Sequence, residues 1–168
     1  MQSKLLLGAA SVFMAVIVSA CGDTTPSATA PSPSPATSPA SSPAAAAATI
    51  MVATDAKLGT ILVDGSGKTL YLFVADKSTA STCYTSCATI WPPVLTDGAP
   101  QAGTGADASM LGTTTRTDGK IEVTYAGHPL YYFVQDKAAG DAKGQAINGF
   151  GGLWWVMSPS GAAIQTKP

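Results

Sequence analysis

The fold is decided by one stretch that occurs twice, 60 residues apart: Gly67-Lys68-Thr69-Leu70-Tyr71-Leu72-Phe73-Val74-Ala75-Asp76-Lys77 and Gly127-His128-Pro129-Leu130-Tyr131-Tyr132-Phe133-Val134-Gln135-Asp136-Lys137. Two such similar stretches indicate a duplicated unit. Because alternate side chains of a strand point to opposite faces, Tyr71 and Phe73 share one face. Leu70 and Leu72 cover the other face. Strands that are apolar on both faces are typically central and buried, so we expect the same of both copies.

Each copy is predicted to contain a β-hairpin. In the first copy, Ile61-Leu62-Val63 meets residues 69–74 across the turn-forming run Asp64-Gly65-Ser66-Gly67-Lys68. In the second copy, residues 121–125 alternate apolar and polar side chains, the pattern of a half-buried strand, and turn at Ala126-Gly127. We therefore predict an all-β fold: antiparallel hairpins in two related repeats, packed as one compact sheet or sandwich-like domain.

A tryptophan-containing run closes each copy. The first copy has Ile90-Trp91-Pro92-Pro93-Val94, and the second has Leu153-Trp154-Trp155-Val156-Met157, with an offset of 63 residues. We expect the tryptophans and the Tyr/Phe pairs to be core residues, with a ligand groove as the alternative. Trp154 and Trp155 point to opposite faces of one strand, so we expect one of them to lie nearer the solvent.

The two Tyr-x-Phe-x-x-Asp motifs resemble the family described as secreted repeat of unknown function, or predicted lipoprotein with the Yx(FWY)xxD motif. The Cys-x-x-x-Cys-Ala-x-x-Trp-Pro-Pro run at residues 83–93 and the Gly-Gly-x-Trp run at residues 151–154 are similar to this family too. The resemblance covers about residues 58–161 and implies an envelope lipoprotein without an established activity. The motif residues are then Tyr71, Phe73, Asp76, Tyr131, Phe133 and Asp136.

The two motif aspartates admit two interpretations. Asp76 and Asp136 follow their strands, where an aspartate can accept hydrogen bonds from backbone N–H groups and close a turn. We expect this structural role, and binding of a cation or another ligand is the alternative. Asp141 lies close to Asp136 in the sequence, but the spacing does not match a calcium-binding loop.

The first 49 residues are predicted to direct export and membrane attachment, and not to belong to the folded domain. Residues 1–20 combine a basic residue, an apolar run and small closing residues, which are the features of a lipoprotein signal peptide. Val18-Ser19-Ala20-Cys21 resembles a lipobox, so Cys21 is the predicted lipidation site; an uncleaved anchor or an ordinary secretory leader is the alternative. Residues 21–49 are rich in Pro, Ser, Ala and Thr and predict a disordered tether. The β-rich domain is expected in residues 50–168.

Two further cysteines, Cys83 and Cys87, remain once Cys21 is assigned to the lipid. Outside the cytoplasm, two thiols at this spacing most often form a disulfide, which we predict. The alternative function is a copper-binding or redox/electron-transfer envelope protein that uses Cys83, Cys87 and His128, because thiolates and imidazole suit copper. A soft methionine ligand would come from one of Met51, Met110 and Met157.

The composition limits the classes of function. Nine Lys and Arg against ten Asp and Glu give a formal net charge of −1, which does not favour nucleic acid as a partner. A single histidine and a single glutamate leave little for general acid–base catalysis. We therefore predict a non-catalytic structural or ligand-binding module, not an enzyme, with no cofactor. Its expected partners are the membrane, through the lipid on Cys21, and an unidentified envelope ligand.

Overall fold

The computed structural model describes residues 46–166 of the chain. The predicted signal peptide, the lipidation site Cys21 and most of the predicted tether lie outside these residues. Within residues 46–166, no helix is both long enough and apolar enough to cross a membrane.

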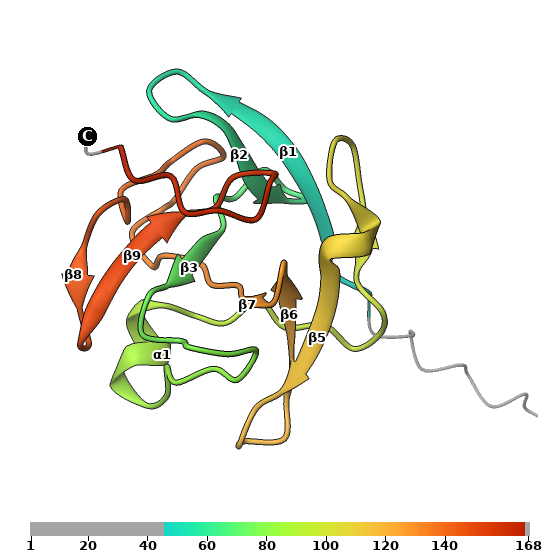
Figure 1. The fold of residues 1–168 in the computed structure, drawn as a ribbon, viewed down its shortest axis with the longest axis vertical. Coiled ribbons are helices and arrows are strands. Elements are labelled where there is room, and N and C mark those ends of the chain that lie inside the picture. Colours follow the sequence, from blue (N-terminus) through green and yellow to red (C-terminus); the bar gives the residue numbers. More distant parts are fainter. Residues whose placement is uncertain (1–45, 167–168) are drawn as a thin grey trace, which may run out of the picture. The chain divides into compact units, whose positions relative to one another are not determined.

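The described chain is built mainly from short strands joined by turns and loops (Figure 1). In chain order the elements are β1 (Thr49–Asp55), β2 (Gly59–Asp64), β3 (Tyr71–Phe73), α1 (Ser86–Ile90), β4 (Gln101–Ala102), a 3-10 turn (Ala108–Met110), β5 (Leu111–Thr115), β6 (Ile121–Tyr125), β7 (His128–Pro129), β8 (Asn148–Gly149) and β9 (Gly152–Val156).

The strands form three small sheets, with the orders β2-β1-β4, β3-β9-β8 and β5-β6-β7. Their pairs are antiparallel except for β1 and β4, which run parallel. The prediction of an all-β fold with antiparallel hairpins in two related repeats is confirmed. The parallel pair and the single short helix α1 are additions that the sequence pattern did not indicate.

The hairpins differ in detail from the predicted ones. In the first copy the full ladder joins β1 to β2, from Ile50 opposite Asp64 to Asp55 opposite Gly59. The predicted pairing of residues 61–63 with residues 69–74 forms only at its base, as a bridge between Val63 and Thr69. The second copy repeats the plan, because β6 pairs along its length with β5 and only briefly with β7. Beyond these bridges, each motif strand turns to another partner.

That partner comes from the other copy. In the first copy, β3 pairs with β9, which closes the second copy, and the two strands lie side by side in Figure 1. In the second copy, residues 130–134 bond to the run that closes the first copy: the N–H of Tyr132 donates to the carbonyl of Pro92 at 2.8 Å, and that of Val134 to the carbonyl of Ile90 at 3.0 Å. The two copies have therefore exchanged their closing strands.

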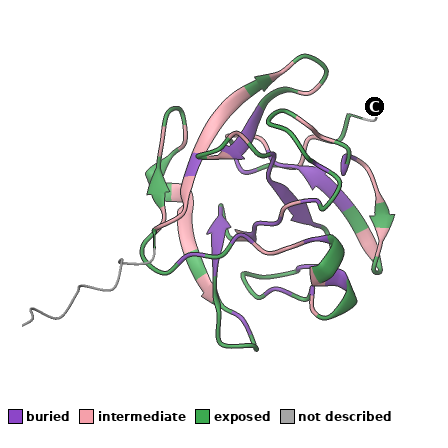
Figure 2. Cartoon of the chain, turned by 180° about the vertical axis from the view of Figure 1, so that it is seen from behind, coloured by how far each residue is buried: buried purple, intermediate pink, exposed green. Residues whose placement is uncertain are grey.

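The exchanged strands lie between two groups of core side chains. One group contains Tyr71, Phe73 and Trp154. The other contains Leu70, Leu72, Trp155 and further aliphatic residues. Figure 2 shows the buried residues concentrated on the central strands and the exposed residues on the turns. The prediction that both faces of the motif strands are apolar and buried matches this arrangement.

The expected difference in exposure between the two adjacent tryptophans is small. Trp154 and Trp155 do point into different core groups, but the first is 0% exposed and the second only 6% exposed. The reason is that β9 is a central strand, covered on both faces, and not the edge of the folded part. Both indole rings therefore contribute to the core.

Candidate functional site

The repeated motif is held by hydrogen bonds that cross between the copies. The hydroxyl of Tyr71 donates to Oδ2 of Asp136 at 2.6 Å, and the hydroxyl of Tyr131 donates to Oδ2 of Asp76 at 2.7 Å. The backbones of Tyr71 and Tyr131 also exchange a pair of N–H···O bonds, of 2.9 and 3.0 Å. Each tyrosine therefore binds the aspartate of the opposite copy.

The second carboxylate oxygen of each aspartate closes a local loop. Oδ1 of Asp76 accepts from the N–H and the hydroxyl of Thr82, at 2.8 and 2.6 Å. Oδ1 of Asp136 accepts from the N–H of Lys143 at 2.9 Å. These bonds are the turn-closing arrangement, and they occupy both oxygens of each carboxylate.

Burial fixes the protonation of the tyrosines. It raises the pKa values of Tyr71 and Tyr131 far above the ordinary value, and the neighbouring carboxylates raise them further. Both phenols therefore stay protonated and act as donors. Burial also raises the pKa of Asp136, against the lowering effect of the hydrogen bonds from Tyr71 and Lys143. Within the motif the tyrosines are the donors and the aspartates the acceptors.

The aromatic rings of both copies form one stack. The rings of Trp91 and Trp154 are parallel within 3° with centroids 4.0 Å apart. Phe73 stacks on the outer face of this pair against Trp154 at 4.0 Å, and Phe133 stacks against Trp91 at 4.4 Å. Neighbours in the stack belong to different copies. The rings fill the core, and Phe73 and Phe133 also border surface hollows.

A buried ion pair beside the motif is a feature that the sequence analysis missed. Nη1 of Arg116 lies 2.7 Å from Oε2 of Glu122 and donates to Oγ of Ser81 at 2.8 Å. Its Nη2 donates to the carbonyl of Cys83 at 2.7 Å. Because Ser81 also contacts the hydroxyl of Tyr131 at 2.7 Å, the pair continues the motif network.

The alternation of residues 121–125 indicated one buried face, and Val123 and Tyr125 on that face are buried, but the opposite face is buried as well. Glu122 is 0% exposed, whereas Ile121 is 37% exposed. The reason appears when the two folded copies are compared. The N–H of the motif leucine donates to the carbonyl of Leu62 in the first copy and of Val123 in the second, so Glu122 occupies the place of the buried Ile61. An acidic residue at this place is buried because the fold is duplicated.

Burial opposes the ionisation of Glu122, whereas Arg116 favours it. Burial raises the pKa of Glu122 to about 7, although the hydrogen bond and the charge of Arg116 lower it. Among the described residues, Oε1 of Glu122 has no hydrogen-bond partner. A buried carboxylate with one unsatisfied oxygen is costly to ionise. The stability of the network should therefore depend on the protonation of Glu122.

The predicted disulfide is present. Cys83 and Cys87 are bonded, with their Cα atoms 5.2 Å apart and both side chains buried. Helix α1 begins between them, and the loop that they close leads to Trp91. In this state neither sulfur is a thiolate, the form that binds copper.

The copper alternative gains no support from the other residues. His128 lies in β7 and lines a surface hollow together with Asp76 and Lys77. Within residues 46–166, no group of three or more His, Cys, Asp or Glu side chains could hold a metal ion. The copper hypothesis stays a prediction from the sequence.

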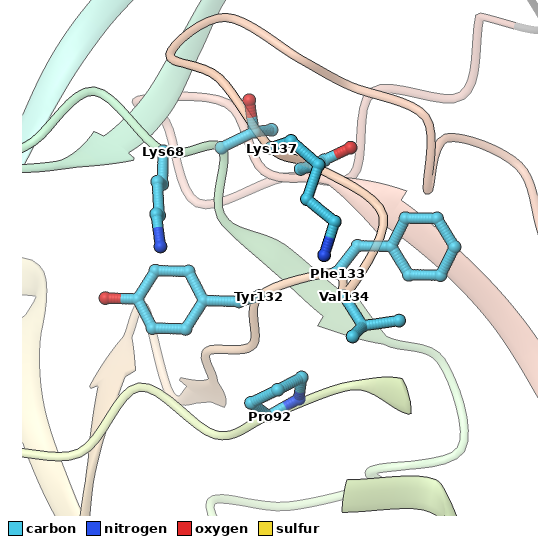
Figure 3. Close-up of a pocket in the computed structure, with 8 residues that line it drawn as sticks. Lys68, Pro92, Tyr132, Phe133, Val134 and Lys137 are labelled. Atoms are coloured by element: carbon cyan, nitrogen blue, oxygen red, sulfur yellow. The ribbon is translucent and has the colours of Figure 1, made fainter. Parts of the chain in front are cut away.

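Two surface hollows correspond to each other in the two copies. One, of about 320 Å³, lies beside Tyr132, Phe133 and Val134 and is also lined by Lys68 and Lys137 (Figure 3). The other, of about 350 Å³, is lined by the equivalent residues Leu72, Phe73, Val74 and Lys77 of the first copy and by His128 of the second, the counterpart of Lys68. These hollows are the accessible places next to the motif.

The fold and the buried motif define a duplicated β module whose two copies close on each other. The family model described as a secreted repeat of unknown function matches residues 52–95 and 112–158, once in each copy and together over more than half of the chain. The chain belongs to this family of secreted repeats and is accordingly extracytoplasmic. No curated protein and no solved structure matches the chain.

Proposed function

We propose that this protein is a non-catalytic module that a lipid on Cys21 anchors to the extracytoplasmic face of the cell membrane. The anchor rests on the lipobox-like run that ends at Cys21. The observation that carries the non-catalytic role is the pair of crossed hydrogen bonds, Tyr71 to Asp136 and Tyr131 to Asp76. They use the polar groups of the repeated motif to hold the two copies together. The motif then serves to build a rigid domain, which the tether displays away from the membrane.

The burial of the reactive groups supports a role without catalysis. Tyr71 and Tyr131 are fully buried. Asp76 and Asp136 are also buried, and both oxygens of each carboxylate accept hydrogen bonds. The cluster that surrounds Arg116 and Glu122 is equally enclosed. A catalytic acid or base must come within hydrogen-bond distance of a substrate, and these groups face one another instead. The surface that remains for function is the outside of the domain.

The proposed partners follow from this placement. The acyl chains on Cys21 would insert into the membrane, because two or more acyl chains give effectively stable anchoring. An envelope ligand would be met at the surface of the domain. The near-neutral charge gives no reason to expect nucleic acid.

Processing of the precursor tests the anchor. We expect Cys21→Ala to block cleavage at this site and to accumulate the full precursor, whereas the wild-type N-terminal peptide carries acyl chains in mass spectrometry. Ser19→Ala, next to the cleavage site but without a thiol to lose, is the matched control and should be processed. A Cys21→Ala variant that is cleaved and membrane-bound like the wild type would overturn the proposal.

A further inference from the structure

The hollow beside the second motif strand combines apolar walls with two positive charges. Pro92, Tyr132 and Val134 contribute its apolar surface. In Figure 3 the side chains of Lys68 and Lys137 both extend toward the side on which Tyr132 and Val134 lie. Nζ of Lys68 lies 5.8 Å from the centroid of the Tyr132 ring. Charge and aromatic surface therefore border the same space.

Within the described residues the ammonium groups have no oxygen partner, although that of Lys68 lies over the ring of Tyr132. Among residues 46–166, no ion pair or side-chain hydrogen bond engages Nζ of Lys68 or of Lys137. The carboxylate of Asp136 also borders the hollow, and it accepts hydrogen bonds from Tyr71 and from the backbone of Lys143. Two ammonium groups against one carboxylate leave the lining with a surplus of positive charge.

The hydroxyl groups that line the same hollow, those of Thr69 and Tyr132, are already engaged in hydrogen bonds within the described residues. The hydroxyl of Thr69 donates to the backbone carbonyl of Asp141 at 2.7 Å. The hydroxyl of Tyr132 donates to Oδ2 of Asp64 at 3.0 Å, and the ring, with Nζ of Lys68 over it, lines the hollow. A ligand would meet ammonium groups and apolar surface.

The equivalent hollow of the first copy lacks this combination. Nζ of Lys77, the counterpart of Lys137, donates to the carbonyl of Val74 at 2.8 Å. His128 stands at the position of Lys68, and Leu72 at that of Tyr132. Two copies with the same backbone plan therefore differ in the groups that a ligand would recognise, so the difference is not required by the fold.

We propose that the hollow of Lys68, Lys137 and Tyr132 binds a small organic anion that carries a carboxylate on a flat apolar body. A carboxylate can accept hydrogen bonds from ammonium donors such as those of Lys68 and Lys137. The ring of Tyr132 and the side chains of Pro92 and Val134 cover the apolar body, whereas an inorganic anion would leave these walls in contact with water. The inference rests on the proposed function and gives the module a class of ligand.

Benzoate is a suitable probe, titrated into the mature full-length protein in lipid nanodiscs with empty nanodiscs as the blank. We expect saturable binding that weakens as salt is added. Lys68→Met and Lys137→Met should each weaken it about three- to fivefold, the size expected for an exposed charge pair. Lys137→Arg should retain binding because it keeps the charge. Lys77→Met, at the equivalent place in the first copy, should leave it unchanged.

Three outcomes would overturn the inference. Sulfate that binds as tightly as benzoate would indicate an adventitious ion only, and benzyl alcohol that binds as tightly would show that the charge is not recognised. Equal weakening by Lys77→Met would place binding elsewhere. Thermal unfolding of each variant confirms that it is folded. Failure of the anchor would appear as a change in precursor processing, so it remains distinct from failure of benzoate to bind.

Discussion

Tyr71 donates a 2.6 Å hydrogen bond to Asp136, which lies 65 residues further along the chain. The tyrosine and aspartate of a single motif are five residues apart, yet each bonds to the opposite copy. Together with the exchanged closing strands, this makes each copy the partner that completes the other. The domain is an internal pair and not a row of two independent units.

Removal of either tyrosine hydroxyl should destabilise the domain. Tyr71→Phe and Tyr131→Phe each leave a buried carboxylate without one donor, which we expect to cost about 1 to 3 kcal/mol in urea unfolding. Tyr132→Phe is the matched control, because its hydroxyl bonds to Asp64, a carboxylate that Ser66 and Lys68 also serve at a more exposed place. A control loss as large as that of Tyr71→Phe would contradict the prediction.

A double-mutant cycle separates the crossed bond from a bond within one copy. Tyr71→Phe and Asp136→Asn should give a coupling energy of about 1 kcal/mol, and Tyr71→Phe with Asp76→Asn should be close to additive. The reverse result would mean that the motif closes on itself in solution.

Unfolding in chelator and in millimolar calcium distinguishes a structural aspartate from a cation ligand. Because both oxygens of Asp76 and of Asp136 accept hydrogen bonds, we expect Asp76→Ala and Asp136→Ala to lose about 1 to 3 kcal/mol equally in the two buffers. A bound ion would stabilise only the wild type, and increasingly with its concentration. Calcium-dependent stability that disappears in the variants would therefore support the cation alternative.

Much of the fold could be predicted because the sequence repeats its pattern. The spacing of the two copies indicated the duplication, and the apolar alternation of residues 69–74 indicated strands buried on both faces. The compartment and the spacing of Cys83 and Cys87 indicated the disulfide. Each of these signals is local, or it compares one stretch directly with another.

The pairing between the copies could not be predicted in the same way. Asp76 and Asp136 carry the same carboxylate group. The sequence pattern alone therefore does not show which of them accepts the hydrogen bond of Tyr71. Glu122 illustrates a second limit. Its local alternation places it outside, and only alignment with Ile61 in the folded copies shows why it is inside. Tertiary contacts thus override local periodicity at the places where the copies meet.

Loss of the disulfide should cost about 2 kcal/mol, because the closed loop is short and chain entropy contributes little more. We expect this change in the unfolding free energy of a Cys83→Ala, Cys87→Ala double variant relative to the oxidised protein. Peptide mass spectrometry without reduction should show Cys83 linked to Cys87. Free thiols in native, oxidised material would instead favour the copper and redox alternative.

Stability should fall as pH rises through the titration of Glu122. Burial raises its pKa from 4.5 to about 7, so the native state binds this proton more tightly than the unfolded chain does. The stabilisation is complete below about pH 4.5 and is lost toward pH 7 and above, by about 3 kcal/mol in all.

Glu122→Gln isolates this effect. The difference in unfolding free energy between the wild type and Glu122→Gln, measured from pH 5 to pH 8, should change in favour of the variant as pH rises. Asp136, whose pKa is also raised by burial, is present in both proteins, so its contribution cancels. A difference that is constant with pH would show that Glu122 keeps one protonation state throughout this range.

A chain cut between the copies should stay in one piece. Gly98 and Ala99 are exposed and lie in the loop between the run that closes the first copy and β5, so a protease site inserted there can be cleaved in the folded protein. The cut leaves β9 paired with β3, and residues 90–94 paired with residues 130–134. The halves should therefore run together in size-exclusion chromatography and separate only in denaturant.

Unfolding of the cut protein should become dependent on its concentration, because it is now a dissociation, while that of the intact chain should not. Adding Tyr71→Phe, which removes a bond between the halves, should lower the urea concentration at which they separate. If the halves part without denaturant, the exchanged strands are not what holds the domain together.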